Sequence, residues 1–425
     1  MIGRFNPQQR EALIVGGGIS GLLITYFLLK RGFRVELHEA AGRLGGLIQT
    51  QKTEYGIAEA AAHSVLVSPA VERLFKELDL ELSPSQTKKK FIFRNGKCRS
   101  WPLTPLESIQ MVFFALFRFA SNPPSPSTSL EEWGAHHLGQ ASVDYLLDPF
   151  LTGIYAATPR EISLLAAYPN WQVPKGRSLF SHQLLRRKSK AKSLGIHCVR
   201  GGMESLTVAL EERIRNHPNA RICFFSEVSQ KLPHSPNLVL TVPAPQAAAL
   251  LETDDSRTSE LLSNLDYAPL VTVTSFYERA SFSKRPEGLG VLVPSRESKN
   301  VRALGVLFNS ASFPERVSNK NLDSFTTLYG GTRDREALKL SDSELTETLS
   351  RDHTLLLGAQ STALHHVISR WPKAIPVYQE RLFQSWHSLE RGWCQNPGKL
   401  VFGNYAGAIS IRGMIEECEI QTDLL

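Results

Sequence analysis

Closely spaced glycines near the N-terminus follow a short apolar segment and could bind a dinucleotide. The apolar segment is Ala-Leu-Ile-Val at 12–15, and "GGGISG" follows at 16–21. In a dinucleotide-binding turn, the first glycine permits a tight turn, the second lets the backbone approach the diphosphate, and the third lets the next helix pack closely. The first amides of that helix can donate to phosphate oxygens. We therefore expect a nucleotide site at Gly16, Gly17, Gly18, Ile19, Ser20 and Gly21.

A carboxylate follows the next predicted strand. The segment "FRVELHEA" at 33–40 is typical of a strand, and Glu39 lies eighteen residues after Gly21. At this position a carboxylate can accept hydrogen bonds from both ribose hydroxyls of the nucleotide, and it disfavours the 2'-phosphate of NADP. The alternative is a glycine turn that only serves packing.

A second glycine-rich segment favours FAD over NAD. The segment "EAAGRLGGLIQT" at 39–50 resembles the second glycine-rich patch of the amine oxidase and protoporphyrinogen oxidase flavoproteins, which plain NAD dehydrogenases lack. The resemblance implies that Arg43 supplies a cation near the diphosphate and that Gly45 and Gly46 let the chain pass close to the flavin. A glycine loop with a solvated arginine is the alternative.

The resemblance to protoporphyrinogen oxidases covers nearly the whole chain. It is most specific at 129–171, "SLEEWGAHHLGQASVDYLLDPFLTGIYAATPREISLLAAYPNW". It implies an α/β protein with a discontinuous Rossmann-type FAD-binding domain, an α+β substrate-binding domain and an inserted helical domain that lies against a membrane. The expected bounds are 1–85, 196–250 and 370–425 for the FAD-binding domain, 86–195 for the helical domain and 251–369 for the substrate-binding domain. Further segments that match the family lie at 200–210, 239–251, 304–317, 329–331, 370–378 and 400–416.

The same resemblance implies an activity and further site residues. The expected reaction is the oxidation of protoporphyrinogen IX to protoporphyrin IX in heme biosynthesis, with FAD as cofactor and oxygen as acceptor. This removes six electrons, and a flavin takes two at a time, so three cycles are needed. The residues expected near FAD are Ala62 and His63 in a loop by the flavin ring, Val228 at the adenine, Trp371 beside the flavin, and Asn404, Ile409, Ser410 and Ile411 near its pyrimidine end.

Some positions depart from the family pattern. The family usually has Gly-Pro where this chain has Ala61 and Ala62, a smaller residue at Ser410, and glycine at Cys418. Added side-chain atoms where backbone should approach the flavin could alter the pocket. The alternatives are therefore a coproporphyrinogen or amine oxidase of the same fold, or a catalytically impaired protein that binds FAD or a tetrapyrrole.

A predicted hairpin could hold the substrate. The segment "FIFRNGKCRSWPLTP" at 91–105 has Asn95-Gly96, a common hairpin turn, four residues before Arg99. In the resembled family an arginine in this hairpin pairs with a propionate, to which a guanidinium presents a planar pair of donors. An exposed surface arginine is the alternative.

Composition and charge limit the class of protein. The chain has 425 residues, so two or three domains are expected, and its net charge of +7 is unaccompanied by a nucleic-acid-binding motif. Five cysteines without a C-x-x-C pair predict free thiols in the cytoplasm and no metal site.

One apolar segment could lie on a membrane surface. Residues 109–120, "IQMVFFALFRFA", are too few to cross a bilayer of about 30 Å, so we expect peripheral contact with the cytoplasmic membrane at most. The alternative is a core segment beside a solvated loop. The basic residues that could assist the contact are Arg186, Arg187, Lys188, Lys190 and Lys192.

Overall fold

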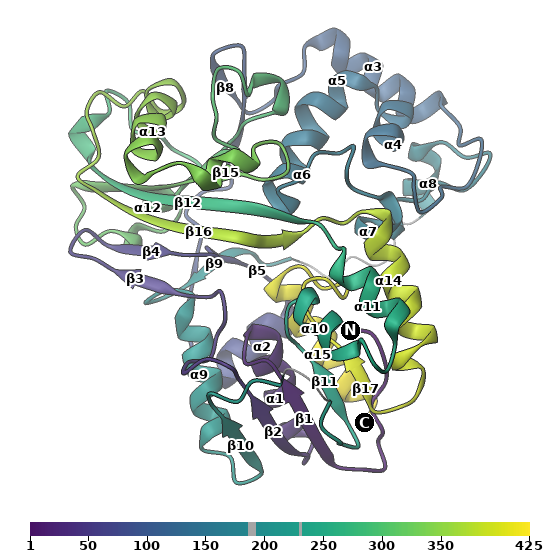
Figure 1. The fold of residues 1–425 in the computed structure, drawn as a ribbon. Helices are drawn as coiled ribbons and strands as arrows, with labels where there is room; N and C mark the ends of the chain where they lie inside the picture. Colours follow the sequence, from purple (N-terminus) through teal and green to yellow (C-terminus); the bar gives the residue numbers. More distant parts are fainter. Residues whose placement is uncertain (186–192, 229–231) are drawn as a thin grey trace.

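The chain folds around two large β-sheets, one at the bottom of the view in Figure 1 and one across its middle and upper part. The computed structural model describes residues 1–185, 193–228 and 232–425. One sheet has five parallel strands, and the other has seven mostly antiparallel strands. This arrangement confirms the predicted α/β class.

The five-stranded sheet has the order β10-β2-β1-β11-β17 and is parallel throughout. Its central strands are apolar because helices and loops cover both faces of a parallel sheet. Three distant parts of the sequence contribute strands, as expected for a discontinuous Rossmann-type unit. The strands are β1 (Glu11–Val15), β2 (Arg34–His38), β10 (Ala220–Cys223), β11 (Leu238–Leu240) and β17 (Lys399–Val401), and the helices packed beside them include α1 (Ile19–Lys30), α9 (Glu204–Arg215) and α15 (Ile411–Asp423).

The seven-stranded sheet has the order β16-β12-β15-β14-β13-β7-β8. Long strands β12 and β16 cross the middle of the view in Figure 1. The predicted hairpin is present at the sheet edge, where Asn95 and Gly96 both have positive φ angles. The strands are β7 (Lys90–Arg94), β8 (Lys97–Arg99), β12 (Tyr267–Glu278), β13 (Gly290–Leu292), β14 (Gly305–Phe308), β15 (Leu322–Gly330) and β16 (His365–Pro376).

The expected domain bounds stay a prediction. Residues 370–376, which we expected in the FAD-binding domain, belong to β16 of the seven-stranded sheet, and the hairpin from the expected helical domain joins that sheet too. Two small sheets and further helices pack around the two large sheets. Those strands are β3 (Thr50–Lys52), β4 (Ile57–Glu59), β5 (Val65–Val67), β6 (Leu82–Pro84) and β9 (Gly195–Val199), and those helices are α2 (Pro69–Glu77), α10 (Ala244–Leu251), α11 (Ser256–Ser263), α12 (Asn309–Ser312), α13 (Asp342–Leu357) and α14 (Glu380–Arg391).

Helices between residues 105 and 185 gather at one end of the molecule, shown in blue in Figure 1. α3 begins with a capping box in which Thr104 and Glu107 bond each other's backbone amides. None of its thirteen residues is buried, so residues 109–117 do not form a core segment, although Ala120 beyond the helix is buried. No helix in the described ranges is long and apolar enough to cross a membrane. These helices are α3 (Pro105–Phe117), α4 (Leu130–His137), α5 (Gln140–Ser142), α6 (Asp148–Tyr155), α7 (Leu164–Ala167) and α8 (Leu179–Leu185).

A buried histidine joins α13 to the seven-stranded sheet. His353 Nδ1 lies 2.9 Å from the Tyr277 hydroxyl of β12, and its Nε2 lies 2.7 Å from the Thr327 hydroxyl of β15. Burial, and to a smaller extent His366, lowers the pKa of His353 to about 3. The imidazole is therefore neutral in the folded protein at neutral and mildly acidic pH.

Acidification should destabilise the fold through His353. Its folded pKa lies below the unfolded value, so stability rises with pH between about 3 and 6.5 and is lost as pH falls through that window. Between pH 7 and pH 5, His353 should contribute a loss of about 2 kcal/mol in the free energy of unfolding. Urea unfolding of His353→Gln should show a correspondingly smaller difference between the two pH values. The same difference as in the wild type would contradict this, and the exposed His387→Gln is the control.

Candidate active site

The glycine turn after β1 is shaped by close packing on one side and is open on another. A Cβ at Gly21 would lie 1.9 Å from the Gly16 carbonyl oxygen, so a side chain cannot fit there. Gly16 itself has φ +108°. A Cβ at Gly18 would meet nothing within 4 Å, and Gly18 caps α1 without a side-chain hydrogen bond. The turn therefore presents open space beside the backbone at the helix N-terminus, as a bound diphosphate requires.

Glu39 lies against this turn. Its Oε2 accepts a hydrogen bond from the Gly17 amide at 2.6 Å, and its Oε1 accepts one from the Ala41 amide at 2.8 Å. A carboxylate has about four acceptor positions, so lone pairs remain for ribose hydroxyls. The structure thus brings together the glycines and the carboxylate that the sequence analysis singled out.

The second glycine-rich segment packs on the first. The Gly45 amide donates to the Gly17 carbonyl at 2.8 Å, and Gly18 and Gly45 form an isolated parallel bridge. The Arg43 guanidinium donates to the carbonyls of Leu44 and Gly46 at 2.8 and 2.6 Å. Arg43 therefore stabilises its own loop, and its partly exposed guanidinium lies 4.0 Å from the Glu204 carboxylate near the turn.

A second helix N-terminus lies beside α1. The Ser20 hydroxyl donates to the sulfur of Met414 at 3.5 Å, which places the first turns of α1 and α15 side by side. Ser410 is the N-cap of α15 and accepts a hydrogen bond from the Gly413 amide. Two positive helix ends thus converge, and together they suit an anionic dinucleotide. Ile409 and Ile411 flank this cap, whereas Asn404 lies before it and accepts the Tyr378 hydroxyl at its carbonyl.

The remaining residues expected near the cofactor lie around the loop after β4. The Trp371 indole donates to the Ala60 carbonyl at 2.8 Å, which positions the loop that carries Ala62 and His63. Val228 is half-buried and packs on the core beside the parallel sheet. The residues of this region fit a large flavin nucleotide, since the open glycine turn, the carboxylate and both helix ends are available to it.

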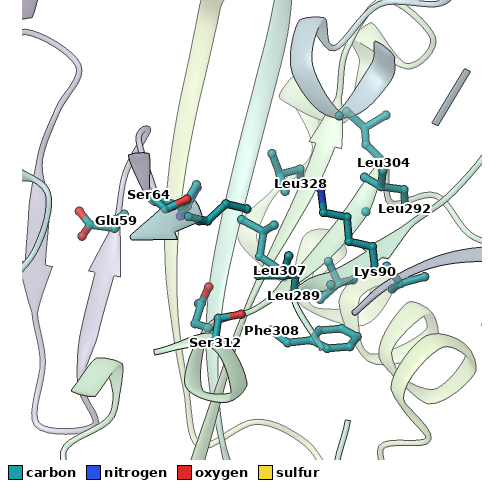
Figure 2. Close-up of a pocket in the computed structure, with 18 of the residues that line it drawn as sticks. Glu59, Ser64, Lys90, Leu289, Leu292, Leu304, Leu307, Phe308, Ser312 and Leu328 are labelled. Carbon is teal, nitrogen blue, oxygen red and sulfur yellow. The ribbon is translucent and has the colours of Figure 1, made fainter. Parts of the chain in front are cut away.

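A cavity of about 510 Å³ lies between the seven-stranded sheet, α6 and the loop after β4 (Figure 2). This volume is within the usual range for a small-molecule site. Its walls are mostly apolar, with few polar groups. The apolar walls include Phe150, Ile154, Leu289, Leu292, Leu304, Leu307, Phe308 and Leu328, and the polar groups are Glu59, His63, Ser64, Lys90, Thr152, Asn309, Ser312 and Arg316.

A buried ion pair forms one end of the cavity. Arg316 pairs with Glu59, and both side chains are almost completely buried. Glu59 also accepts the Met203 amide at 2.8 Å and the Thr50 hydroxyl at 2.7 Å. Arg316 donates to the His63 carbonyl at 2.9 Å. Sequence analysis did not identify Arg316, because its partner lies 257 residues away.

His63 presents an unsatisfied nitrogen in this region. Its Nε2 is buried without a hydrogen-bond partner among the described residues. Burial, followed by the nearby Arg316, lowers the pKa of His63 to about 4, so the ring is neutral at physiological pH. A neutral imidazole carries one donor and one acceptor, and Nε2 can therefore bond a polar atom of a bound molecule.

Lys90 lines the cavity, whereas Arg99 does not. Figure 2 shows the Lys90 side chain among the leucines of the cavity wall, and its ammonium has no hydrogen bond or ion pair within the described chain. Arg99 is an exposed residue of β8 and is absent from the cavity lining. Lys90 could not be identified from the sequence because it belongs to a run of three lysines at 88–90. Only the register of the strand determines which of the three side chains faces the cavity.

Known proteins resemble this chain along most of its length. A protoporphyrinogen oxidase 2 of Arabidopsis thaliana is 27% identical over 462 residues, which cover 95% of this chain and 91% of that protein. A crystal structure from Exiguobacterium sp. 255-15, provisionally named a protoporphyrinogen oxidase, has a TM-score of 0.74 at 21% identity and covers 98% of this chain and 100% of that one. A reduced UDP-galactopyranose mutase has a TM-score of 0.75 at 13% identity, with coverage of 98% and 95%. The structural likenesses show a shared fold.

Replacing Glu39 should weaken FAD retention. Glu39→Ala removes a charged acceptor at the glycine turn, and a lost bond of this kind typically costs about 1.5 to 3 kcal/mol, or roughly ten- to a hundredfold in affinity. Bound FAD should be measured by absorbance and by titration of stripped protein. The exposed Glu11→Ala, on β1, is a matched control that should bind FAD as the wild type does. Wild-type FAD affinity in Glu39→Ala would remove Glu39 from the site.

A family model spans most of both sheets and the cavity, whereas β1 and the glycines at 16–18 precede the matched residues. The model describes flavin containing amine oxidoreductases and matches residues 19–405, from the first residue of α1 to the turn after β17. The match confirms the predicted FAD cofactor and identifies an FAD-dependent oxidase. The chain belongs to the family of flavin containing amine oxidoreductases.

Proposed function

We propose that this enzyme oxidises a porphyrinogen, with protoporphyrinogen IX as the expected substrate and oxygen as the acceptor. The observation that carries the proposal is the cavity, whose apolar walls suit a tetrapyrrole ring and whose unpaired Lys90 suits an acidic side chain. The Arabidopsis relative is named a protoporphyrinogen oxidase, and its match covers 95% of this chain. That relative supports the same substrate class.

The protein's main task in such a reaction is to position the substrate. Bound FAD supplies a two-electron acceptor for a hydride from a methylene bridge. Conversion of a porphyrinogen into a porphyrin removes six electrons and six protons, and three molecules of oxygen can accept them as hydrogen peroxide. The apolar walls exclude water and hold the macrocycle in place, so the proposed reaction needs no protein nucleophile or paired carboxylates.

Two polar residues would orient the ring. The Lys90 residue is exposed at one side of the cavity, and its ammonium would pair with a propionate of the substrate by a charged hydrogen bond. The neutral His63 would accept a hydrogen bond from a pyrrole N–H through Nε2, which otherwise stays unsatisfied. The Glu59–Arg316 pair would hold the His63 loop in place, since Arg316 bonds its carbonyl.

Removing Lys90 should weaken substrate binding. A lost charged hydrogen bond typically costs about 1.5 to 3 kcal/mol, so Lys90→Ala should raise KM roughly ten- to a hundredfold with little change in kcat. FAD content should be unchanged, and Lys90→Arg should retain most of the efficiency. The steady-state rate of porphyrin formation at several porphyrinogen concentrations gives KM and kcat, and anaerobic bleaching of the flavin shows whether each variant still reduces it. Wild-type kinetics in Lys90→Ala would remove it from the site.

The same assay tests Arg99, the anchor expected from the sequence. Both residues are exposed, but only Lys90 lines the cavity, so Arg99→Ala should lose less efficiency than Lys90→Ala. The reverse order would restore Arg99 as the anchor.

Product spectra with coproporphyrinogen and with a simple amine distinguish the alternative substrates. A protein with full FAD that oxidises none of them would contradict the proposed activity.

An exposed apolar surface supports a peripheral membrane location. Eight large apolar side chains on α3, on α8 and on the segments beside α3 are each more than half exposed. The helices α3 and α8 are in contact. Phe150 and Ile154 of α6 are also exposed and line the cavity. A poorly soluble substrate could thus enter from a membrane surface. The residues of this apolar surface are Trp101, Leu106, Ile109, Val112, Phe113, Phe117, Phe119 and Phe180; the basic run at 186–192, expected to assist, lies outside the described residues.

Polar substitutions on this surface should reduce membrane binding. Each exposed side chain of this size contributes about 1.5 to 3 kcal/mol when it is fully buried in an apolar phase. The affinity of the triple variant Ile109→Ser, Phe113→Ser, Phe117→Ser for anionic liposomes, measured by flotation, should therefore be at least about a hundredfold lower than that of the wild type. A matched triple variant with exposed residues elsewhere should float as the wild type does. Equal flotation of both triple variants would contradict the proposal. The control residues, each changed to serine, are Leu355, Leu364 and Ile420.

A further inference from the structure

Three metal-binding side chains of different kinds meet at the edge of the parallel sheet. Glu36 and His38 lie two residues apart on β2, so both point to the same face of the sheet. Cys223 on the neighbouring strand β10 pairs in register with His38. One ligand atom from each residue lies within 4.8 Å of the other two. The sequence analysis expected no metal site, because Cys223 is far from the other two residues in the chain.

The distances within the cluster suit a single small ion. His38 Nε2 lies 2.8 Å from Glu36 Oε1, and Cys223 Sγ lies 3.6 Å from the same oxygen. Tetrahedral zinc sites have bonds of about 2.0 to 2.3 Å, which separate their ligand atoms by only slightly more than 3 Å. Small side-chain rotations would therefore admit an ion. All three side chains are half-buried, so solvent can reach the cluster.

The surroundings orient two of the three ligands. His38 Nδ1 lies 2.7 Å from the Ser226 hydroxyl, so the second ring nitrogen is occupied and Nε2 faces the cluster. Metal-binding histidines usually have such a partner on the other nitrogen. The exposed Arg221 lies 3.7 Å from Glu36 Oε2, which leaves Oε1 for the cluster. The positive charge of Arg221 would repel a bound cation, but the Arg221 side chain is exposed and can move away from it.

We propose that Glu36, His38 and Cys223 bind a zinc ion. Zinc accepts oxygen, nitrogen and sulfur ligands together, whereas magnesium and calcium require oxygen ligands. On binding, the Cys223 thiol releases its proton to solvent, and the thiolate and the Glu36 carboxylate balance the two positive charges of the ion. A water molecule would complete four ligands.

The site adjoins the nucleotide-binding turn but is separate from the cavity. The Cys223 carbonyl accepts the Glu39 amide at 2.9 Å, and the Ser226 amide donates to the Glu39 carbonyl at 2.9 Å. An ion held by β2 and β10 would thus crosslink the strand ends that carry Glu39. Because a ligand that binds only the folded state stabilises it, zinc should raise the melting temperature.

Zinc titration of the FAD-loaded protein tests the site directly. In competition with a chromogenic chelator, the wild type should bind one more equivalent of zinc than Cys223→Ser, and His38→Gln should lose the same equivalent. Cys98→Ser, which removes an exposed thiol elsewhere, should retain it. Ser226→Ala should bind zinc about ten- to a hundredfold more weakly, because the hydrogen-bond partner of a metal-binding histidine typically contributes that much.

The result that would overturn the proposal is equally direct. If the wild type and Cys223→Ser bind the same amount of zinc, or if Cys98→Ser removes the equivalent, the three side chains form no zinc site. Melting curves without zinc show whether each variant is folded, and a zinc-induced rise that occurs in the wild type and in Cys98→Ser but not in His38→Gln supports the site independently. The assay needs no porphyrinogen, so its outcome is separate from that of the proposed activity.

Discussion

The buried ion pair between Glu59 and Arg316 joins the two halves of this enzyme. Glu59 lies at the end of β4 and is bonded by Thr50 and Met203 near the nucleotide-binding region, whereas Arg316 follows α12 on the substrate side. A buried charge without its partner is costly, and loss of one member of such a pair typically costs about 3 to 5 kcal/mol. The pair therefore ties the position of the cavity to that of the cofactor region, and Arg316 extends this connection to the His63 carbonyl.

The cofactor region depends on a different constraint, the close approach of backbone segments. Gly21 must lack a side chain to pack on Gly16, and the loop with Gly45 must lie on Gly17 and Gly18. These contacts aim the N-terminus of α1 at open space, and the Ser20 contact brings the N-terminus of α15 beside it. The departure at Ser410 is consistent with this geometry, because its hydroxyl caps α15. Cys418 is completely buried on the same helix, within the core that packs α15.

The substrate region combines apolar surface with few polar groups. Its cavity has a satisfied ion pair at one end, a neutral histidine beside it, and in its wall a lysine that has no hydrogen bond or ion pair among the described residues. The helices around α3 expose apolar side chains that a protein in water alone would usually bury. Both features are consistent with the proposed peripheral membrane location.

The sequence by itself determined the local features whose chemistry resides in neighbouring residues. The glycine turn, the carboxylate of Glu39 and the Asn95-Gly96 hairpin were all predictable, because strand and helix periodicity and positive-φ positions are encoded within short segments. Only the tertiary structure decided which distant side chains meet. Lys90 rather than Arg99 lines the cavity because of the register of β7 on β13, Glu59 meets Arg316 across 257 residues, and Cys223 joins Glu36 and His38 because β10 pairs with β2. Such pairings depend on sheet order, which the spacing of residues along the chain does not encode.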